Sequence, residues 1–295
     1  MASTALLRPA DPPAARRLRP IDLLLFLAAT LLAFWQLRDY AWDKMFLRYA
    51  LYDDEGALLI FAKAFLALGG RLYQTDLEIV GYGPFYFLYK WLWHGLLALP
   101  IDHDTTRLVT LGEWLVASFL LGWFLLRATG SAVLAAFLAV EVFLANAAVA
   151  NEPSHPQSLL TLLVALALAA AAHLPGKRDA IAAFFMGFCG GAMLLVKINA
   201  GVYFLAPAAF LLLTPCLGGA WRQAIAVLFF AGGALLPSLL MRRHLATDWG
   251  CSYALLASSG ILSAMLATLV AGVEAIGGER PGRRLGAFAI GVLVA

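Results

Sequence analysis

The stretch LVTLGEWLVASFLLGWFLL, residues 108–126, decides the fold class of this chain. It contains one ionisable side chain, Glu113, and it is followed by Arg127. An apolar run of this length matches the roughly 20 residues that a helix needs to cross the hydrocarbon core of a bilayer. The stretch therefore predicts a transmembrane helix.

Composition extends this prediction to the whole chain. Of the 295 residues, 62% are apolar and 13% are charged, and the mean hydropathy is +0.83. Soluble domains are roughly half apolar and a quarter charged, so one water-facing globule cannot bury this excess. We expect an all-α polytopic membrane protein surrounded by membrane lipids. The net charge of only +3, without a basic stripe interleaved with aromatic residues, gives no reason to expect a nucleic-acid partner.

About nine segments are predicted to cross the membrane. They are residues 21–37, 108–126, 132–150, 159–172, 181–196, 202–213, 224–240, 255–276 and 285–295. The last segment has only about eleven residues before Ala295, which is too short to cross. We therefore expect the natural chain to continue beyond Ala295.

Basic residues predict how these segments are oriented. Four arginines precede the first span: Arg8, Arg16, Arg17 and Arg19. Because positively charged loops stay on the cytoplasmic side, the N-terminal tail, residues 1–20, is predicted to be cytoplasmic. The basic loop 173–178 agrees with this orientation. Residues 21–295 then form one transmembrane domain, with residues 38–107 as its first outer loop.

The first outer loop holds two apolar segments that are poor spans. Residues 56–68 are short, and residues 84–99 carry Lys90 and His94. We expect both to form helices that lie along the membrane surface. The alternative for residues 84–99 is a true span, since about sixteen residues are near the lower limit. In that case the sides of all later segments reverse, and Lys197 leaves the outer face.

Three carboxylates, Asp53, Asp54 and Glu55, stand together at the start of the first of these helices. Asp53 is a good N-cap, and the helix dipole favours negative charge in the first turn. The chemical interpretation is that one carboxylate accepts a proton from an acceptor hydroxyl, or that two hold a divalent metal cation that neutralises a leaving phosphate. The two interpretations are compatible, because capping holds a carboxylate in position.

Residues 54–56, 62–67, 69–73 and 83–86, which read DEG, AKAFLA, GGRLY and GPFY, resemble the first outer loop of bacterial membrane glycosyltransferases. They are similar to the GT-C fold class, and within it to the family 39 and protein-mannosyltransferase-like group that transfers sugars to lipopolysaccharide and lipid A. The resemblance implies a GT-C-like transmembrane helix bundle in the bacterial inner membrane, with its active site on the outer face. It extends more weakly through Arg107.

The resemblance also implies a reaction. An acidic residue of the first outer loop is catalytic in that family, and Asp54 fits best, with Asp53 as the second candidate. The donor would be a sugar linked to a polyprenyl phosphate, and the acceptor a lipid, a glycan or a protein. No organic cofactor is implied, and the use of a metal stays open.

Basic residues at the predicted outer ends of spans are candidates for binding the donor phosphate. Lys197 ends the fifth span, and Arg242 and Arg243 oppose the positive-inside trend. The alternative for each is that a long basic side chain reaches for lipid headgroups without a substrate.

Three further residues complete the predicted substrate-binding set: Glu55, Tyr82 and His155. Relatives often carry Asp before a proline where this chain has His155 before Pro156, so His155 is a substitute ligand, although a loop histidine is more often solvated or capping. Some relatives carry a charged residue where this chain has Gly83 before Pro84, so no phosphate or metal ligand is expected there.

A different class of function is a transporter or flippase of a polar or lipid-linked solute. Glu113 and Glu141 lie inside predicted spans, where ionisable groups are costly and usually paired or facing a cavity. A hydrogen bond between helices is the structural alternative for both. A noncatalytic membrane subunit is the third hypothesis.

Overall fold

The computed structural model describes residues 18–47, 54–67, 82–148, 154–174, 178–271 and 281–295. These parts of the chain form helices and contain no strand. The helices are α1 (Pro20–Trp42), α2 (Asp54–Ala67), α3 (Pro84–Trp91), α4 (His103–Thr129), α5 (Ala132–Ala148), α6 (Pro156–Ala171), α7 (Asp179–Val196), α8 (Ile198–Leu213), α9 (Gly219–Leu240), α10 (Asp248–Ala271) and α12 (Pro281–Val294). Short π turns extend α1 over Asp43–Leu47 and α3 over Leu92–Leu96, and a 3-10 turn follows α8 over Thr214–Cys216.

Six of these helical segments are long and apolar enough to cross a membrane. They are residues 20–47, 103–129, 179–196, 198–216, 219–240 and 248–270. The apolar helices α5 and α6 are shorter, with 17 and 16 residues, and α12 has 14. The prediction of an all-helical multi-pass membrane protein is confirmed, and six of the roughly nine predicted spans reach the length that crossing requires.

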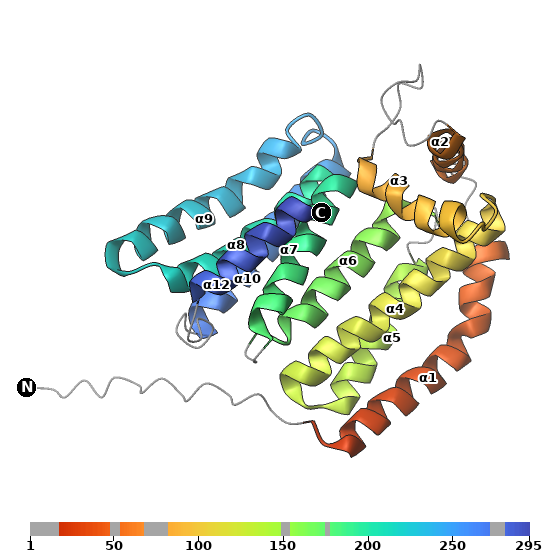
Figure 1. Ribbon diagram of the computed structural model, residues 1–295, viewed down its shortest axis with the longest axis horizontal. Coiled ribbons are helices and arrows are strands. Elements are labelled where there is room, and N and C mark those ends of the chain that lie inside the picture. The colour runs from red at the N-terminus through yellow and green to blue at the C-terminus, as the bar shows by residue number, and fades with distance from the viewer. Residues whose placement is uncertain (1–17, 48–53, 68–81, 149–153, 175–177, 272–280) are drawn as a thin grey trace, which may run out of the picture.

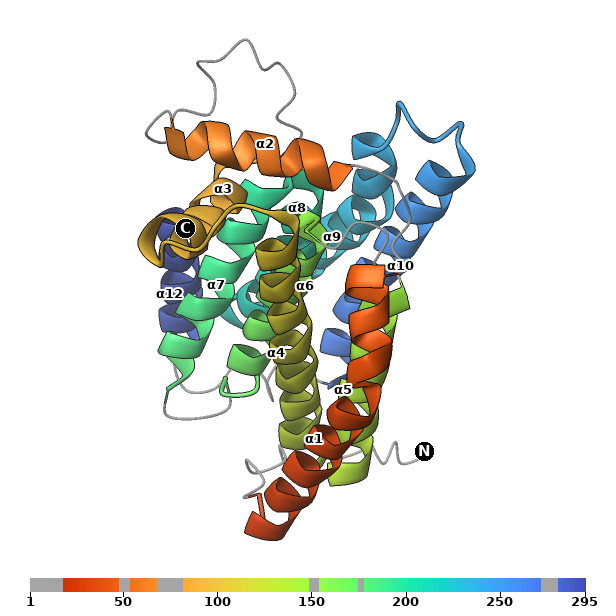
Figure 2. The same cartoon turned by 90° about the vertical axis from the view of Figure 1, so that its right-hand side faces the viewer.

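Two helices do not run along the bundle. Figures 1 and 2 show α2 and α3 lying across one end of it. With its π turn, α3 ends at Leu96, so residues 84–99 do not form one long helix parallel to the others. The arrangement agrees with two separate helices and not with the alternative of a span, and their position along the membrane surface stays a prediction.

The remaining helices alternate in direction. The C-terminal ends of α1, α5, α7, α9 and α12 lie at the same end of the bundle as the first residues of α4, α6, α8 and α10 (Figure 1). We call this end, which α2 and α3 cross, the site end.

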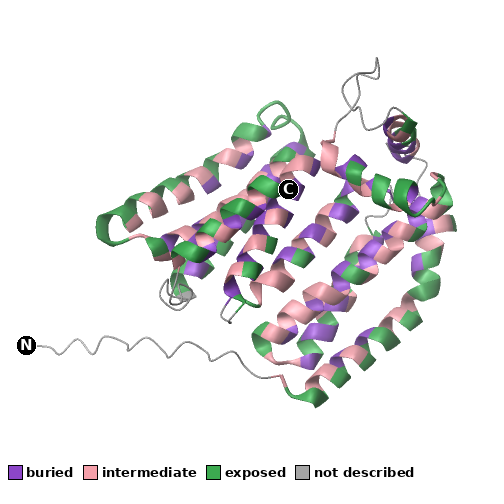
Figure 3. Ribbon diagram, in the orientation of Figure 1, coloured by how far each residue is buried: buried purple, intermediate pink, exposed green. Residues whose placement is uncertain are grey.

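A shared apolar core holds α2 and α3 against the bundle. Leu58 and Phe65 of α2 and Tyr86 and Phe87 of α3 are buried in one cluster with residues of α6 and α7, including Val196. Outer helices such as α1 and α9 expose most of their apolar side chains (Figure 3). An apolar exterior of this extent is unfavourable in water and fits a lipid environment.

Glycines set the closest helix contact, between α7 and α12. A Cβ added at Gly187 would come within 2.0 Å of the carbonyl oxygen of Phe288, and one at Gly291 within 2.1 Å of that of Phe184. The two backbones therefore touch, as small residues allow in membrane helix pairs. At the start of both helices, Asp179 accepts hydrogen bonds from Arg283 and Arg284. The predicted incomplete last span is thus a helix that begins at Pro281 and packs along α7.

Candidate functional site

The first turn of α2 brings two residues of the predicted acidic cluster, Asp54 and Glu55, to the site end. Asp54 is the first residue of α2, as expected for a carboxylate in the first turn. Asp53, the predicted N-cap, lies outside the described residues. Glu55 is buried, with 3% of its surface exposed.

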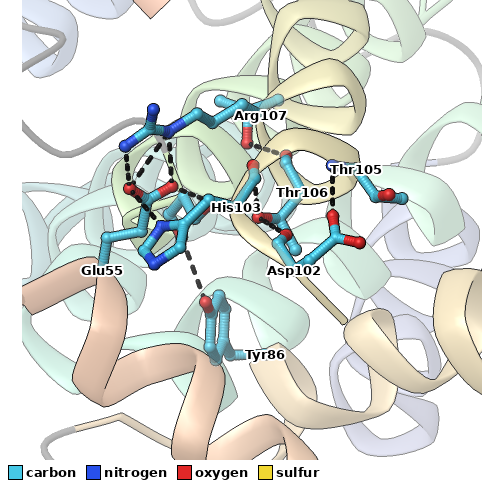
Figure 4. Close-up of polar contacts among 9 residues, drawn as sticks. Glu55, Tyr86, Asp102, His103, Thr105, Thr106 and Arg107 are labelled. Carbon is cyan, nitrogen blue, oxygen red and sulfur yellow. Dashed lines mark hydrogen bonds and ion pairs between the residues drawn. The ribbon is translucent and has the colours of Figure 1, made fainter. Parts of the chain in front are cut away.

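Glu55 is held by residues from two other segments (Figure 4). Arg107 of α4, itself 4% exposed, donates from Nε to Oε1 at 3.0 Å and from Nη2 to Oε2 at 2.5 Å. His103 Nδ1 lies 3.0 Å from Oε2, and the hydroxyl of Ser154, before α6, donates to Oε1 at 2.9 Å. The bidentate geometry is the strong form of an arginine–carboxylate pair.

The partners of Glu55 decide its charge. Burial by itself would raise the pKa of this carboxyl, but hydrogen bonds from Arg107, His103 and Ser154 outweigh it, so the pKa lies below its usual value. Glu55 is therefore an ionised group at neutral pH whose acceptor positions are taken by the protein itself. In this arrangement it joins α2, α4 and the segment before α6.

The start of α4 is fixed by its own cap. Asp102 accepts a hydrogen bond from the Thr105 backbone N–H at 2.8 Å, which is the usual N-cap geometry. This bond lowers the pKa of Asp102. Because the cap orients the first turn of α4, His103 and Arg107 both face Glu55.

Ser154 and His155 connect the same segment to α3. The Tyr86 hydroxyl donates to the Ser154 carbonyl at 3.0 Å. His155 caps α6, because its Nδ1 accepts from the Gln157 backbone N–H at 3.3 Å. The neutral ring then carries its proton on Nε2, which lies 2.5 Å from the Tyr82 hydroxyl. The capping alternative for His155 is confirmed, its role in substrate binding stays a prediction, and the contact with Tyr82 is one that the sequence did not suggest.

Tyr82 also contacts Lys197, another residue of the predicted substrate-binding set. The Lys197 ammonium lies 5.9 Å from the centre of the Tyr82 ring, within the range of a cation–π contact. Next to Tyr82, the Gly83 backbone N–H donates to the Val196 carbonyl at 3.0 Å. A Cβ at Gly83 would come within 2.0 Å of the Leu195 carbonyl oxygen. Only glycine lets this turn rest on the end of α7.

Burial lowers the pKa of Lys197, which is partly enclosed between α7 and α8. Arg242 and Arg243 are exposed on the turn after α9. That turn is tied to the start of α8 by a contact of 3.9 Å between the Asn199 amide nitrogen and the Met241 sulfur. The two arginines are therefore at the site end. Within the described residues, their side chains make no hydrogen bond or ion pair with the other predicted site residues.

Four predicted residues thus belong to one continuous set of contacts: Glu55, His155, Tyr82 and Lys197. We call this set, with Ser154 and Arg107, the site network. Sequence reasoning missed the roles of His103, Ser154 and Tyr86, and it noted Arg107 only through the family resemblance. One signal was available for Arg107: it is the only basic residue between Asp104 and Leu126, and it stands close to the predicted outer end of its span.

A second polar cluster adjoins the site network, because the Lys90 ammonium lies 5.5 Å from the centre of the Tyr86 ring. Lys90 of α3 and Glu113 of α4 are both buried. They interact electrostatically, and Glu113 also forms a hydrogen bond with Tyr89. The expectation that Glu113 needs a partner is met by α3. Glu141 is exposed on α5 and so does not share a buried path with Glu113.

The predicted metal site is not tested. Among the described residues, no group of three or more His, Cys, Asp or Glu side chains is placed to hold a metal ion. The possible ligands were any two of Asp53, Asp54 and Glu55, and Asp53 lies outside those residues, so metal use by this cluster stays a prediction.

Comparison with known proteins adds no relative to this geometry. No protein-family model, no curated protein and no solved structure matches the chain. A function for the site end therefore has to be argued from its residues.

Proposed function

We propose that this protein is a membrane glycosyltransferase. It moves a sugar from a polyprenyl-phosphate carrier to a lipid, glycan or protein acceptor at the site end, on the outer face of the bacterial inner membrane. The observation that carries the proposal is the convergence of Asp54, at the start of α2, with Tyr82, His155 and Lys197 at one bundle end. These residues come from four separate segments of the chain.

Asp54 acts as the base in this proposal. It takes the proton of the acceptor hydroxyl, whose oxygen forms a bond to the anomeric carbon while the bond from that carbon to the carrier phosphate breaks. A carboxylate at a helix N-terminus is stabilised in its ionised form by the helix dipole. The Glu55–Arg107 pair holds α2 in place and leaves proton transfer to its neighbour.

The leaving carrier phosphate gains negative charge, which a nearby cation offsets. Lys197 lies where α7 ends and α8 begins, so a phosphate at the membrane surface can reach it from a lipid carrier whose chain stays in the bilayer. Arg242 or Arg243 adds a second positive charge at the same end. The Lys197 contact with Tyr82 sets the position of the ammonium.

The test is Asp54→Asn in the full-length protein, incubated in lipid vesicles with labelled polyprenyl-phosphate sugars and candidate acceptors. We expect transfer to fall by at least about a hundredfold, as removal of a general base does, with expression and unfolding temperature unchanged. The matched control is Asp104→Asn, an exposed carboxylate in the first turn of α4. Unchanged transfer by Asp54→Asn would overturn the assignment of the base.

One observation favours a second candidate, a transporter of a polar or lipid-linked solute. The Lys90–Glu113 pair is buried beside α4, a helix long enough to cross the membrane, and buried ionisable groups in such helices often line transport paths. The discriminating measurement is solute flux in vesicles. Flux that Glu113→Gln abolishes and Asp54→Asn leaves intact supports the transporter.

A further inference from the structure

Helices α4 and α6 run in the same direction and end opposite the site end (Figure 1). They are joined nearer their starts by a hydrogen bond of 3.0 Å from the Trp114 indole N–H to the Ser158 hydroxyl. Arg127 comes about thirteen residues after Trp114, and His173 about fifteen after Ser158. A rise of 1.5 Å per residue carries both roughly 20 Å from that hydrogen bond. Arg127 and His173 therefore reach the same level of the bundle.

Arg178 joins these two residues from the start of α7. It is the N-cap residue of α7, and its side chain makes no capping hydrogen bond. Partial burial lowers the pKa of His173, and the positive charges of Arg127 and Arg178 lower it further, which agrees with the three side chains being neighbours. The imidazole is then neutral at pH 7 and offers one N–H donor. We call Arg127, His173 and Arg178 the basic cluster.

The basic cluster has donors without acceptors. Within the described parts of the chain, none of its three side chains forms an ion pair or a hydrogen bond. The acid that follows it in the sequence, Asp179, is bound by Arg283 and Arg284. The Nε–H of Arg127 is buried and has no acceptor, although the residue as a whole is only partly buried. Because buried donors are nearly always hydrogen bonded, this guanidinium lacks a partner.

We propose that the basic cluster binds the phosphate of an anionic phospholipid. It stands at the end of α4, a helix long enough to cross the membrane, so it lies where headgroups lie while the acyl chains stay beside the helices. Arginine donates paired hydrogen bonds to phosphate oxygens, and basic pockets between membrane helices bind anionic headgroups. A headgroup with an ammonium of its own is disfavoured, because it brings a further cation to two arginines.

A general attraction between anionic lipids and this positively charged end is the alternative. Arg222 separates the two explanations. It lies at the same end, near the start of α9, and its guanidinium already donates to the Leu217 carbonyl at 3.0 and 2.8 Å. Removing the charge of Arg222 weakens a general attraction as much as removing that of Arg127, but it leaves the basic cluster intact. None of these residues belongs to the site network, so the inference does not depend on the proposed reaction.

The test titrates phosphatidylglycerol into the full-length protein in a neutral detergent and counts bound lipids by native mass spectrometry. We expect Arg127→Gln and Arg178→Gln each to weaken the tightest-bound lipid at least about tenfold, and Arg222→Gln to weaken it less than about twofold. Arg127→Lys should also weaken it, because lysine keeps the charge but loses the paired donors. Since Arg178 is exposed, Arg178→Gln tests the basic cluster even where Arg127→Gln lowers the amount of folded protein.

Two further titrations identify the ligand. Phosphatidylcholine should bind at least about tenfold more weakly than phosphatidylglycerol, and an excess of inorganic phosphate should not displace phosphatidylglycerol. Equal binding of the two lipids, or displacement by inorganic phosphate, overturns the proposal of an anionic phospholipid. Binding that Arg178→Gln leaves unchanged overturns it as well. Equal weakening by Arg127→Gln and Arg222→Gln would show a general attraction to this end of the bundle in place of a site.

Discussion

Glu55 and Arg107 form a buried ion pair between α2 and α4, and His103 and Ser154 complete the hydrogen bonds of the carboxylate. Taking two charges out of water is costly, and the cost is offset only when both partners and their hydrogen bonds are present. The pair therefore makes the position of α2 depend on two individual side chains.

Removing one partner should be more harmful than removing both. We expect Glu55→Gln and Arg107→Gln each to lower the free energy of unfolding by about 3–5 kcal/mol, because each leaves an uncompensated buried group. The double variant Glu55→Leu, Arg107→Leu should lose less than either single variant. Thermal unfolding in detergent measures these differences, with the exposed Arg243→Gln as control. Single variants as stable as wild type would contradict the buried pair.

Glu55 also predicts a pH dependence of stability. Burial acts to raise its pKa, but the hydrogen bonds from Arg107, His103 and Ser154 bring it below the unperturbed 4.5. A carboxyl with a depressed pKa contributes stability that is present above the unfolded-state pKa and is lost as the pH falls through the folded-state pKa. We expect the unfolding temperature of wild type to decrease as the pH drops below about 4.5. The unfolding temperature of Glu55→Gln should change less over the same range, and equal slopes would contradict the assignment.

At the scale of elements, α2 and α3 carry site residues and α7 supports them. The turn before α3 reaches α7 through the Gly83 N–H and the Val196 carbonyl, while α7 is packed along α12 through Gly187 and Gly291. Since the α7 backbone is held on both sides, its end at Lys197 has a defined position relative to Tyr82.

Gly83→Ala tests this support. The added methyl group overlaps the Leu195 carbonyl, so the turn has to move away from α7, and overpacking of this kind costs about 1–3 kcal/mol. If Tyr82 and Lys197 act together, sugar transfer should fall more than the loss of folded protein explains. Gly112→Ala in α4, where an added Cβ meets nothing within 4 Å, is the matched control. Equal activity in Gly83→Ala, Gly112→Ala and wild type would count against a role for this turn.

At the scale of the whole molecule, the alternating helices separate two ends. The site end carries Lys197, Arg242 and the site network, whereas the opposite end carries Asp179 with its two arginines. The proposed orientation, with a cytoplasmic N-terminus, places the site end outside.

Two native cysteines test that orientation. Cys251, in the first turns of α10, and Cys216, after α8, are both exposed, and they lie at opposite ends of the bundle. In intact spheroplasts, a membrane-impermeant maleimide should label Cys251 and should reach Cys216 only after the membrane is permeabilised. Cys251→Ser and Cys216→Ser identify the labelled position. Labelling of Cys216 alone in intact cells would reverse the sides and place the site end in the cytoplasm.

Local sequence determined the helical class, most helix positions and the two short helices between the first two long ones, because hydropathy and capping depend on neighbouring residues. It also identified Glu55, Tyr82, His155 and Lys197 as worth attention. Only the tertiary structure decided that Glu55 is held by Arg107, 52 positions away, that α12 packs on α7, and that Glu141 faces outward. Each of these depends on which helix faces meet. Nearly every predicted span carries apolar residues on all of its faces, so hydropathy alone cannot distinguish a face that meets lipid from one that meets another helix.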